Sequence, residues 1–181
     1  MEFLASQPKI SGAILASTTA YTDYDSELSD WNEFQQRNEQ INEDVKLLFS
    51  SDVSAKEKTA RLAQLTSPLD IWDLDLLPEV HQTLDRISFS GEWMNAWQKG
   101  ALRSSEFDYP NVVSNAEVPV LLLHGEMDMR FPVGVTTRLA VAAPKVQHVV
   151  IASAGHLTHI EKNEAWIESI ERFVASTKSS A

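Results

Sequence analysis

VPVLLLHGEMDMRFPVGVTTRLAVAAPKVQHVVIASAGH, residues 118–156, holds two apolar runs with one amphipathic segment between them. The runs at 118–124 and 146–152 lack the alternation of a half-exposed strand, which is typical of strands covered on both faces. Between them, Pro132 begins a segment whose apolar residues recur at helical spacing. Two strands joined by a helix run parallel, because a parallel pair needs a crossover connection. The stretch therefore predicts an α/β fold with a parallel sheet.

The segments on either side extend this pattern. Residues 9–16, KISGAILA, form a third apolar run between Pro8 and a Ser-Thr-Thr sequence, which predicts another buried strand. At the carboxyl end, apolar residues at helical spacing predict a helix over 162–176, and residues 1–6 fit the last turns of a helix. We expect a sheet of about three parallel strands with flanking helices.

The middle of the chain, 23–110, has a helical pattern instead. Two sequences typical of helix starts, Asp30-Trp-Asn-Glu33 and Ser54-Ala-Lys-Glu57, precede apolar residues at helical spacing. The helices expected from this periodicity are 31–49, one after Ser54, one whose first turn holds Pro78, and a short one at 91–100. We therefore predict a helical insertion between two parts of one core, 1–22 and 111–181.

Composition excludes several classes of protein. The 181 residues carry a net charge of −11, which argues against nucleic acid or an anionic membrane as partner. There is no cysteine, and the five histidines form no cluster, so we expect neither a metal site nor a bound cofactor. No apolar run is long enough to cross a membrane, and the first residues do not resemble a signal peptide. These observations predict one globular, cytoplasmic unit.

Two residues with catalytic chemistry follow the ends of neighbouring strands. Asp128 comes after 118–124 in a turn that contains Gly125, and His156 comes after 146–152 among small residues. Because the carboxyl ends of parallel strands meet at one edge of the sheet, we expect both side chains there. In a catalytic triad, a carboxylate orients a histidine that takes the proton of a serine hydroxyl. Asp128 and His156 are therefore the predicted acid and general base.

Simpler interpretations exist for these and the neighbouring polar residues. A lone aspartate after a strand is most often a turn residue, and Asp128 alone would be read so. His124 and His159 are expected to be packed or solvated, and Glu126 to face solvent. The two remaining histidines, which are expected on the surface, are His81 and His148.

HGEMDMRFP (124–132) followed by AGHLTHIEKNEAW (154–166) resembles the acid and histidine segments of the α/β-hydrolase superfamily, in that family's order. MEFLASQPKISGAILAST (1–18) is similar to the helix and strand that follow the nucleophile, and 23–110 occupies the place of the helical cap, or lid. The resemblance covers nearly the whole chain. It implies the C-terminal part of an α/β-hydrolase sheet with an inserted cap.

The resemblance implies a serine hydrolase that acts on an ester or peptide bond, with Asp128 and His156 as catalytic residues. The family's nucleophile elbow, G-x-S-x-G, is absent from this chain. Ser88-Phe89-Ser90-Gly91 is the nearest string, but it lacks the first glycine and follows a predicted helix. We expect the serine to come from a segment outside this sequence.

Two functional hypotheses remain open from the sequence. In the first, the chain is the C-terminal part of a serine hydrolase with a small ester or peptide substrate. In the second, it is a catalytically inactive truncated hydrolase that associates with itself or with a partner. An unpaired edge on strand 9–16 would recruit another chain, which predicts a homo-oligomer or a bound amino-terminal fragment.

The predicted cap contains one candidate substrate-binding cluster. Glu92, Trp93 and Trp97 lie within about two helical turns, where the indoles would wall a pocket and the carboxylate would hold an amine. The alternative is a tryptophan stripe that packs the cap on the core. An acidic cap also resembles, more weakly, the proline iminopeptidase branch, whose cap carboxylates hold the substrate's amino terminus.

Overall fold

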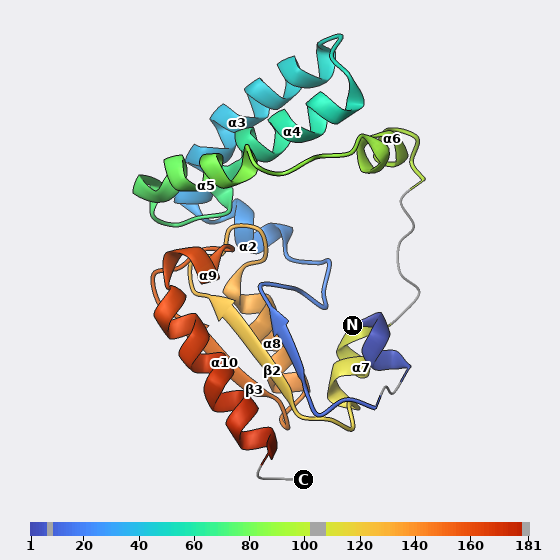
Figure 1. The fold of residues 1–181 in the computed structure, drawn as a ribbon, viewed down its shortest axis with the longest axis vertical. Helices are drawn as coiled ribbons and strands as arrows, with labels where there is room; N and C mark the ends of the chain where they lie inside the picture. Colours follow the sequence, from blue (N-terminus) through green and yellow to red (C-terminus); the bar gives the residue numbers. More distant parts are fainter. Residues whose placement is uncertain (7–8, 102–107, 179–181) are drawn as a thin grey trace.

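The computed structural model describes residues 1–6, 9–101 and 108–178. Within these ranges, three parallel strands form one sheet in the order β1-β2-β3 (Figure 1). The strands are β1 Ala13–Ala16, β2 Val120–Gly125 and β3 Gln147–Ile151. All of the central strand β2 is buried, as its unbroken apolar run predicted. The predicted α/β class and the parallel sheet of about three strands are confirmed.

The strand β1 is shorter than the predicted strand 9–16. Its ladder begins at Ala13, whose N–H donates to the Pro119 carbonyl at 2.9 Å, because β2 itself begins only at Val120. The residues before Ala13 lie beyond the first residue of β2. Gly12 lies against the Phe173 ring, where an added Cβ would be 3.1 Å from the nearest ring atom.

Helices cover both faces of the sheet (Figure 1). They are α8, Val133–Ala142, and α10, Asn163–Lys178. Successive β2 residues belong to different core clusters, because side chains alternate across a strand. Leu122 packs with Leu139 of α8, whereas Leu121 packs with Phe173 of α10. This two-sided burial explains why Val120, Leu121, Leu122 and Leu123 of β2 are all apolar.

A second group of helices lies beyond the carboxyl ends of the strands (Figure 1). We call residues 25–98 the helical layer. Its elements are α2 Asp25–Ser29, α3 Asn32–Ser50, α4 Ala55–Thr66, the 3₁₀ turns η1 Ser67–Leu69 and η2 Leu74–Leu76, α5 Leu77–Leu84, and α6 Glu92–Gln98. The predicted helices of the middle segment are present. The role of this layer as a lid stays a prediction.

The two predicted helix starts had different outcomes. Ser54 is the N-cap of α4, and its hydroxyl accepts a hydrogen bond from the Glu57 N–H at 3.2 Å. The helix predicted over 31–49 is present as α3, but its N-cap is Trp31 rather than Asp30, which directly follows α2. Trp31 occupies the N-cap position without a side-chain hydrogen bond, because an indole has no acceptor for a backbone N–H. Its ring stacks on Trp72 instead.

An apolar cluster joins the helical layer to the sheet domain. Ile41, Leu69 and Met129 are buried against one another, and Trp31 stacks on Trp72 with ring centroids 6.4 Å apart. Met129 is 1% exposed and follows the predicted acid directly. Burying such a side chain contributes about 2 kcal/mol, so the layer stabilises the loop that carries Asp128.

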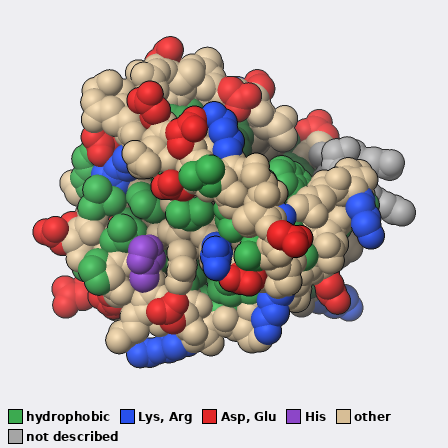
Figure 2. All heavy atoms as spheres, turned by 90° about the horizontal axis from the view of Figure 1, so that it is seen from above, with side chains coloured by type: hydrophobic (Ala, Val, Ile, Leu, Met, Phe, Trp, Pro, Cys, Tyr) green, Lys and Arg blue, Asp and Glu red, His purple; other side chains and the backbone are tan. Residues whose placement is uncertain are grey.

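Some predictions fall on residues outside the described ranges. These are 7–8 of the predicted core segment 1–22, 102–107 of the predicted cap 23–110, and the tail 179–181. Among the described residues, no helix is long and apolar enough to span a membrane. Figure 2 shows acidic and basic side chains interspersed on the face formed by the helical layer, with apolar side chains between them.

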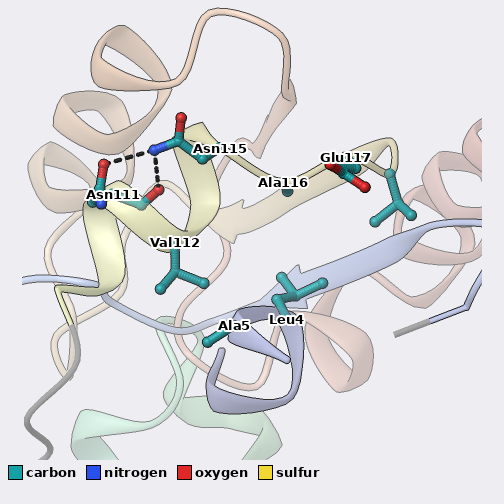
Figure 3. A pocket seen from close by; sticks show the side chains of 8 residues that line it. Leu4, Ala5, Asn111, Val112, Asn115, Ala116 and Glu117 are labelled. Carbon is teal, nitrogen blue, oxygen red and sulfur yellow. Dashed lines mark hydrogen bonds between the residues drawn. The ribbon is translucent and has the colours of Figure 1, made fainter. Parts of the chain in front are cut away.

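A cavity of about 190 Å³ lies between two short helices (Figure 3). These helices are α1, Glu2–Ala5, and α7, Tyr109–Ser114. Aliphatic side chains, two amides and the carboxylate of Glu117 line the cavity, and the Asn115 amide donates to the Asn111 carbonyl and side chain. Its lining ends at Val118, before β2 begins, whereas the predicted catalytic residues follow the other end of the strands. We therefore do not regard it as the active site.

Candidate active site

Two loops meet at the carboxyl edge of the sheet. We call 126–132, after β2, the acid loop, and 152–157, after β3, the histidine loop. The Glu126 N–H donates to the Ile151 carbonyl at 2.9 Å, and the Met127 N–H donates to the Ala154 carbonyl at 2.8 Å. Gly125 permits this approach, because an added Cβ would lie 2.2 Å from the Gly155 carbonyl oxygen.

The acid loop holds Asp128 as a fully buried carboxylate. Its Oδ1 accepts hydrogen bonds from the backbone N–H groups of Arg130 at 2.8 Å and Phe131 at 2.9 Å. Its Oδ2 lies 3.0 Å from Nδ1 of His156. The side chain has no solvent exposure, so these donors replace the water that a charged group would otherwise require.

The histidine loop presents His156 beside that carboxylate. Ser17, which follows β1, donates its hydroxyl to the His156 carbonyl at 2.7 Å, so all three strand ends contribute to the site. The imidazole keeps 25% of its side-chain exposure. Because Oδ2 of Asp128 is an acceptor, Nδ1 carries the proton and Nε2 is the basic nitrogen of the neutral ring.

His124 is a second imidazole at the same carboxylate. It is fully buried, and its Nε2 lies 2.7 Å from the Phe131 carbonyl and 3.2 Å from Oδ2 of Asp128. Both neighbours are acceptors, which places a proton on Nε2. Burial lowers the pKa of His124, against the opposing effect of the Asp128 charge. His124 is therefore a neutral hydrogen-bond donor. The sequence left open whether it is packed or solvated, and in the structure it is packed.

Two aromatic residues that no local sequence pattern indicated lie near the pair. The Phe131 ring lies 5.5 Å from the His156 ring, and Tyr24 meets Phe131 edge-on at 5.9 Å. Burial raises the pKa of Tyr24, and the charges of Asp25 and Asp128 add to this effect. Tyr24 lies before α2, about a hundred residues from the acid, so no local spacing connects them.

The predicted cap cluster lies elsewhere in the helical layer. Trp93 and Trp97 of α6 are each about half exposed, and their rings are parallel with centroids 6.1 Å apart. Trp97 also packs on Phe49 of α3, and Glu92 is exposed. These contacts are within the layer, so the tryptophans do not form the predicted stripe between cap and core. Their role in binding substrate stays a prediction.

The remaining polar residues have structural contacts. Glu126 is exposed, as expected, and its side chain accepts from the Ser153 N–H at 3.0 Å. His81 and His148 are half-buried, which corrects the prediction that both are surface residues. Nε2 of His81 lies 2.9 Å from the Ser67 hydroxyl, and burial lowers the pKa of His148. Among the described residues, no group of three or more His, Asp or Glu is suited to hold a metal ion.

A comparison of the sequence with protein families agrees with the parallel α/β sheet. The alpha/beta hydrolase fold family matches residues 3–163. The chain belongs to this family. Ser88-Phe89-Ser90-Gly91, the string nearest to the hydrolase nucleophile motif, lies in an irregular segment between α5 and α6 rather than in a strand–turn–helix context. None of the curated proteins matches the sequence significantly.

Solved structures show the same hydrolase fold at low sequence identity. A thermophilic esterase from Thermogutta terrifontis is 22% identical with a TM-score of 0.64, over 95% of this chain and 58% of the esterase. An alpha/beta fold family hydrolase from Bacillus anthracis str. Sterne is 15% identical with a TM-score of 0.65, over 96% and 60%. An esterase from Exiguobacterium antarcticum is 15% identical with a TM-score of 0.60, over 98% and 61%.

This alpha/beta hydrolase chain spans about three fifths of the length of those structures. The similarity shows the fold and does not single out the proline iminopeptidase branch. The described geometry contains a buried Asp128 side chain, a partly exposed imidazole bonded to it, and two backbone N–H groups that donate to Oδ1 of Asp128.

Proposed function

We propose that Asp128 and His156 are the acid and general base of a serine hydrolase that cleaves an ester or peptide bond. The observation that carries this proposal is the 3.0 Å contact between Oδ2 of Asp128 and Nδ1 of His156, with the carboxylate buried and the imidazole partly open. The nucleophilic serine would come from a segment outside this sequence.

In the proposed mechanism, Nε2 of His156 takes the proton of the serine hydroxyl as its oxygen attacks the substrate carbonyl. The imidazolium that forms is stabilised by Asp128, whose charge is supported by two backbone N–H donors on Oδ1. His156 then gives this proton to the leaving alcohol or amine as the bond to the acyl group breaks. Water repeats the sequence on the acyl-serine, and His156 returns the proton to the serine.

We further propose that the helical layer, as the cap, covers the substrate. Phe131 and Tyr24 form an aromatic wall beside His156, which suits an apolar group on the substrate. Glu92, Trp93 and Trp97 are a weaker proposal, because their contacts are with one another and with α3. The choice between ester and peptide substrates stays open within this proposal.

The proposed position for the missing segment is the open edge of β1. Ala13 and Ser17 donate their N–H groups to the β2 side, so the intervening Ile14 and Ala16 direct their backbone groups to the other side. Within the described residues, β1 pairs with β2 alone. A strand that carries the serine would complete the ladder there.

The same edge supports the second candidate function, a catalytically inactive module that associates with itself or a partner. Ile14 is 36% exposed on this strand, so a second copy would also bury apolar surface there. Under this alternative, the Asp128–His156 contact is a structural remnant of the fold.

The test is to purify the protein from its natural source and label it with a fluorophosphonate probe for activated serines. The proposal predicts one labelled serine in a G-x-S-x-G segment that is linked to, or bound by, this chain. Replacing His156 with alanine should abolish labelling, while the control Glu168→Ala, in an exposed ion pair with Arg172 on α10, should label normally. A 20.2 kDa species that takes no label and self-associates in light scattering would overturn the proposal and support the second candidate.

A further inference from the structure

A short segment of the helical layer contacts both loops of the candidate site. We call residues 66–73, which connect α4 to η2, the brace. Ser67 and Ile71 in the brace are almost completely buried. Arg37 of α3 holds the brace from the other side, since its guanidinium donates to three of its carbonyls. These belong to Pro68 at 2.8 Å, Ile71 at 2.8 Å and Trp72 at 3.1 Å.

Asp70 is the residue of the brace that touches both loops. Its Oδ1 accepts from Nε of Arg130 at 2.5 Å, and Arg130 also donates to the Thr66 carbonyl at 2.8 Å. Arg130 belongs to the acid loop and gives its own N–H to Asp128. The backbone carbonyl of Asp70 accepts from the Leu157 N–H at 2.8 Å, next to the histidine. One aspartate therefore links the acid loop to the histidine loop.

Glu161 makes the second connection between the brace and the histidine loop. It ends α9, Thr158–Glu161. Its Oε1 accepts from the N–H groups of Trp72 at 2.8 Å and Asp73 at 2.9 Å, and its Oε2 accepts from the Gly155 N–H. Three backbone donors on one carboxylate form a strong, charge-assisted connection.

The brace also fits tightly against Gly155. An added Cβ at this position would lie 2.8 Å from the Trp72 nitrogen and 2.9 Å from Ile71. Gly155 and Leu157 lie on either side of His156 in the chain. The Gly155 N–H donates to Glu161, which is bonded to the brace, and the Leu157 N–H donates to the Asp70 carbonyl of the brace itself. The backbone of His156 is fixed by these bonds and by the Ser17 hydroxyl on its carbonyl.

We infer that Asp70 and Glu161 are positioning residues, through which the helical layer sets the orientation of His156 toward Asp128. This inference rests on the proposed function, since it assumes that His156 is the base. It goes beyond that function by proposing that the helical layer is joined, through the brace, to both the acid loop and the histidine loop. Asp70 and Arg130 keep 21% and 30% of their side-chain exposure, so their ion pair is screened less than a surface pair.

The test uses ¹⁵N-labelled 181-residue chain and two readouts. The first is the ring ¹⁵N chemical shifts of His156, which report the fraction of the ring that carries its proton on Nδ1. The second is amide hydrogen exchange at Gly155 and Leu157. The variants are Glu161→Gln, which keeps the side-chain volume, and Asp70→Ala.

In Glu161→Gln, we expect exchange at Gly155 to be about tenfold faster or more, since its charge-assisted hydrogen bond contributes that much protection. Asp70→Ala removes the ion pair with Arg130 but keeps the backbone carbonyl that accepts from Leu157, so we expect a smaller increase at Leu157. We also expect the His156 ring to become a mixture of the two tautomers. Asp85→Ala is the matched control, because Asp85 accepts only an exposed bond from Gln64 in the same layer. Its spectrum and exchange should equal the wild type.

A purely structural role would speed exchange but leave the ring tautomer unchanged, and this result would overturn the inference. If Asp70→Ala does not fold, Asp70→Asn, which keeps the side-chain size and removes the charge, replaces it with the same expectation for the tautomer. Neither readout requires a nucleophile. A failure of fluorophosphonate labelling would therefore count against the proposed function alone, and an unchanged tautomer would count against the brace alone.

Discussion

Replacing Asp128 with asparagine tests the central contact of the site with almost no change in volume. Oδ1 of the new amide can still accept from the N–H groups of Arg130 and Phe131. Its NH₂ group, however, would face Nδ1 of His156, which carries a proton in the wild type, so two donors would meet. We expect the His156 ring to exchange its tautomer, so that Nδ1 accepts from the amide and Nε2 becomes protonated and unable to act as a base.

The energetic cost follows from the bonds of Oδ2. The charge-assisted bond to His156 is replaced by a neutral one, while His124 keeps its 2.7 Å bond to the Phe131 carbonyl. A loss of about 1–2 kcal/mol in the free energy of unfolding is expected, since bonds to charged groups contribute about 1.5–3 kcal/mol and neutral ones about 1. Urea unfolding measures this loss, and ¹⁵N shifts of the ring report the tautomer.

The control for this substitution is Asp23→Asn, because Asp23 is an exposed partner of Arg138 far from the acid loop in sequence. It should change neither the tautomer nor the stability by more than about 0.5 kcal/mol. If a serine segment is supplied, Asp128→Asn should slow fluorophosphonate labelling by about 10³–10⁴. A His156 ring that keeps its Nδ1 proton in Asp128→Asn would refute the assignment of Asp128 as its acceptor.

Three further predictions concern groups around this pair. His124→Gln keeps a donor near the Phe131 carbonyl and should retain most of the stability, whereas His124→Leu leaves that carbonyl unsatisfied and should cost about 1–3 kcal/mol in urea unfolding. Gly125→Ala should destabilise the chain by about 3 kcal/mol, because its Cβ would collide with the Gly155 carbonyl. The comparison is Gly12→Ala, whose Cβ would meet only side-chain atoms of Phe173 and Thr177, at 3.1 Å or more, and which should cost less in the same assay. The free energy of unfolding should fall as the pH drops below about 6.5, because burial lowers the pKa of His124 and the unfolded chain then binds a proton that the folded chain does not. His124→Gln should flatten this fall between about pH 6.5 and about pH 5, and equal slopes in both proteins would contradict it.

The sheet and the strand-end residues could be predicted because each depends on local pattern. β2 is an unbroken apolar run, and Asp128 and His156 follow two strands that a single helix connects. Parallel topology then brings their ends together without any knowledge of side-chain contacts.

The other half of the site depends on contacts without a local signal. Asp70 and Arg130 are separated by 60 residues, and Glu161 meets Trp72 across 89. No periodicity encodes such pairs, because they depend on how the helical layer packs on the sheet. The contact between Trp31 and Trp72, which are 41 residues apart, is another example.

The register of the sheet also has a consequence for how the chain reaches its native state. β2 and β3 pair Leu121 with Gln147, so they close a short loop that contains only α8. β1 and β2 pair Ala13 with Val120, which encloses the whole helical layer and a loop about four times longer. Two doublings of loop length add roughly 1.2 kcal/mol of closure entropy. We therefore expect β2, α8 and β3 to assemble early and β1 to dock late, so that mutations in β1 mainly accelerate unfolding.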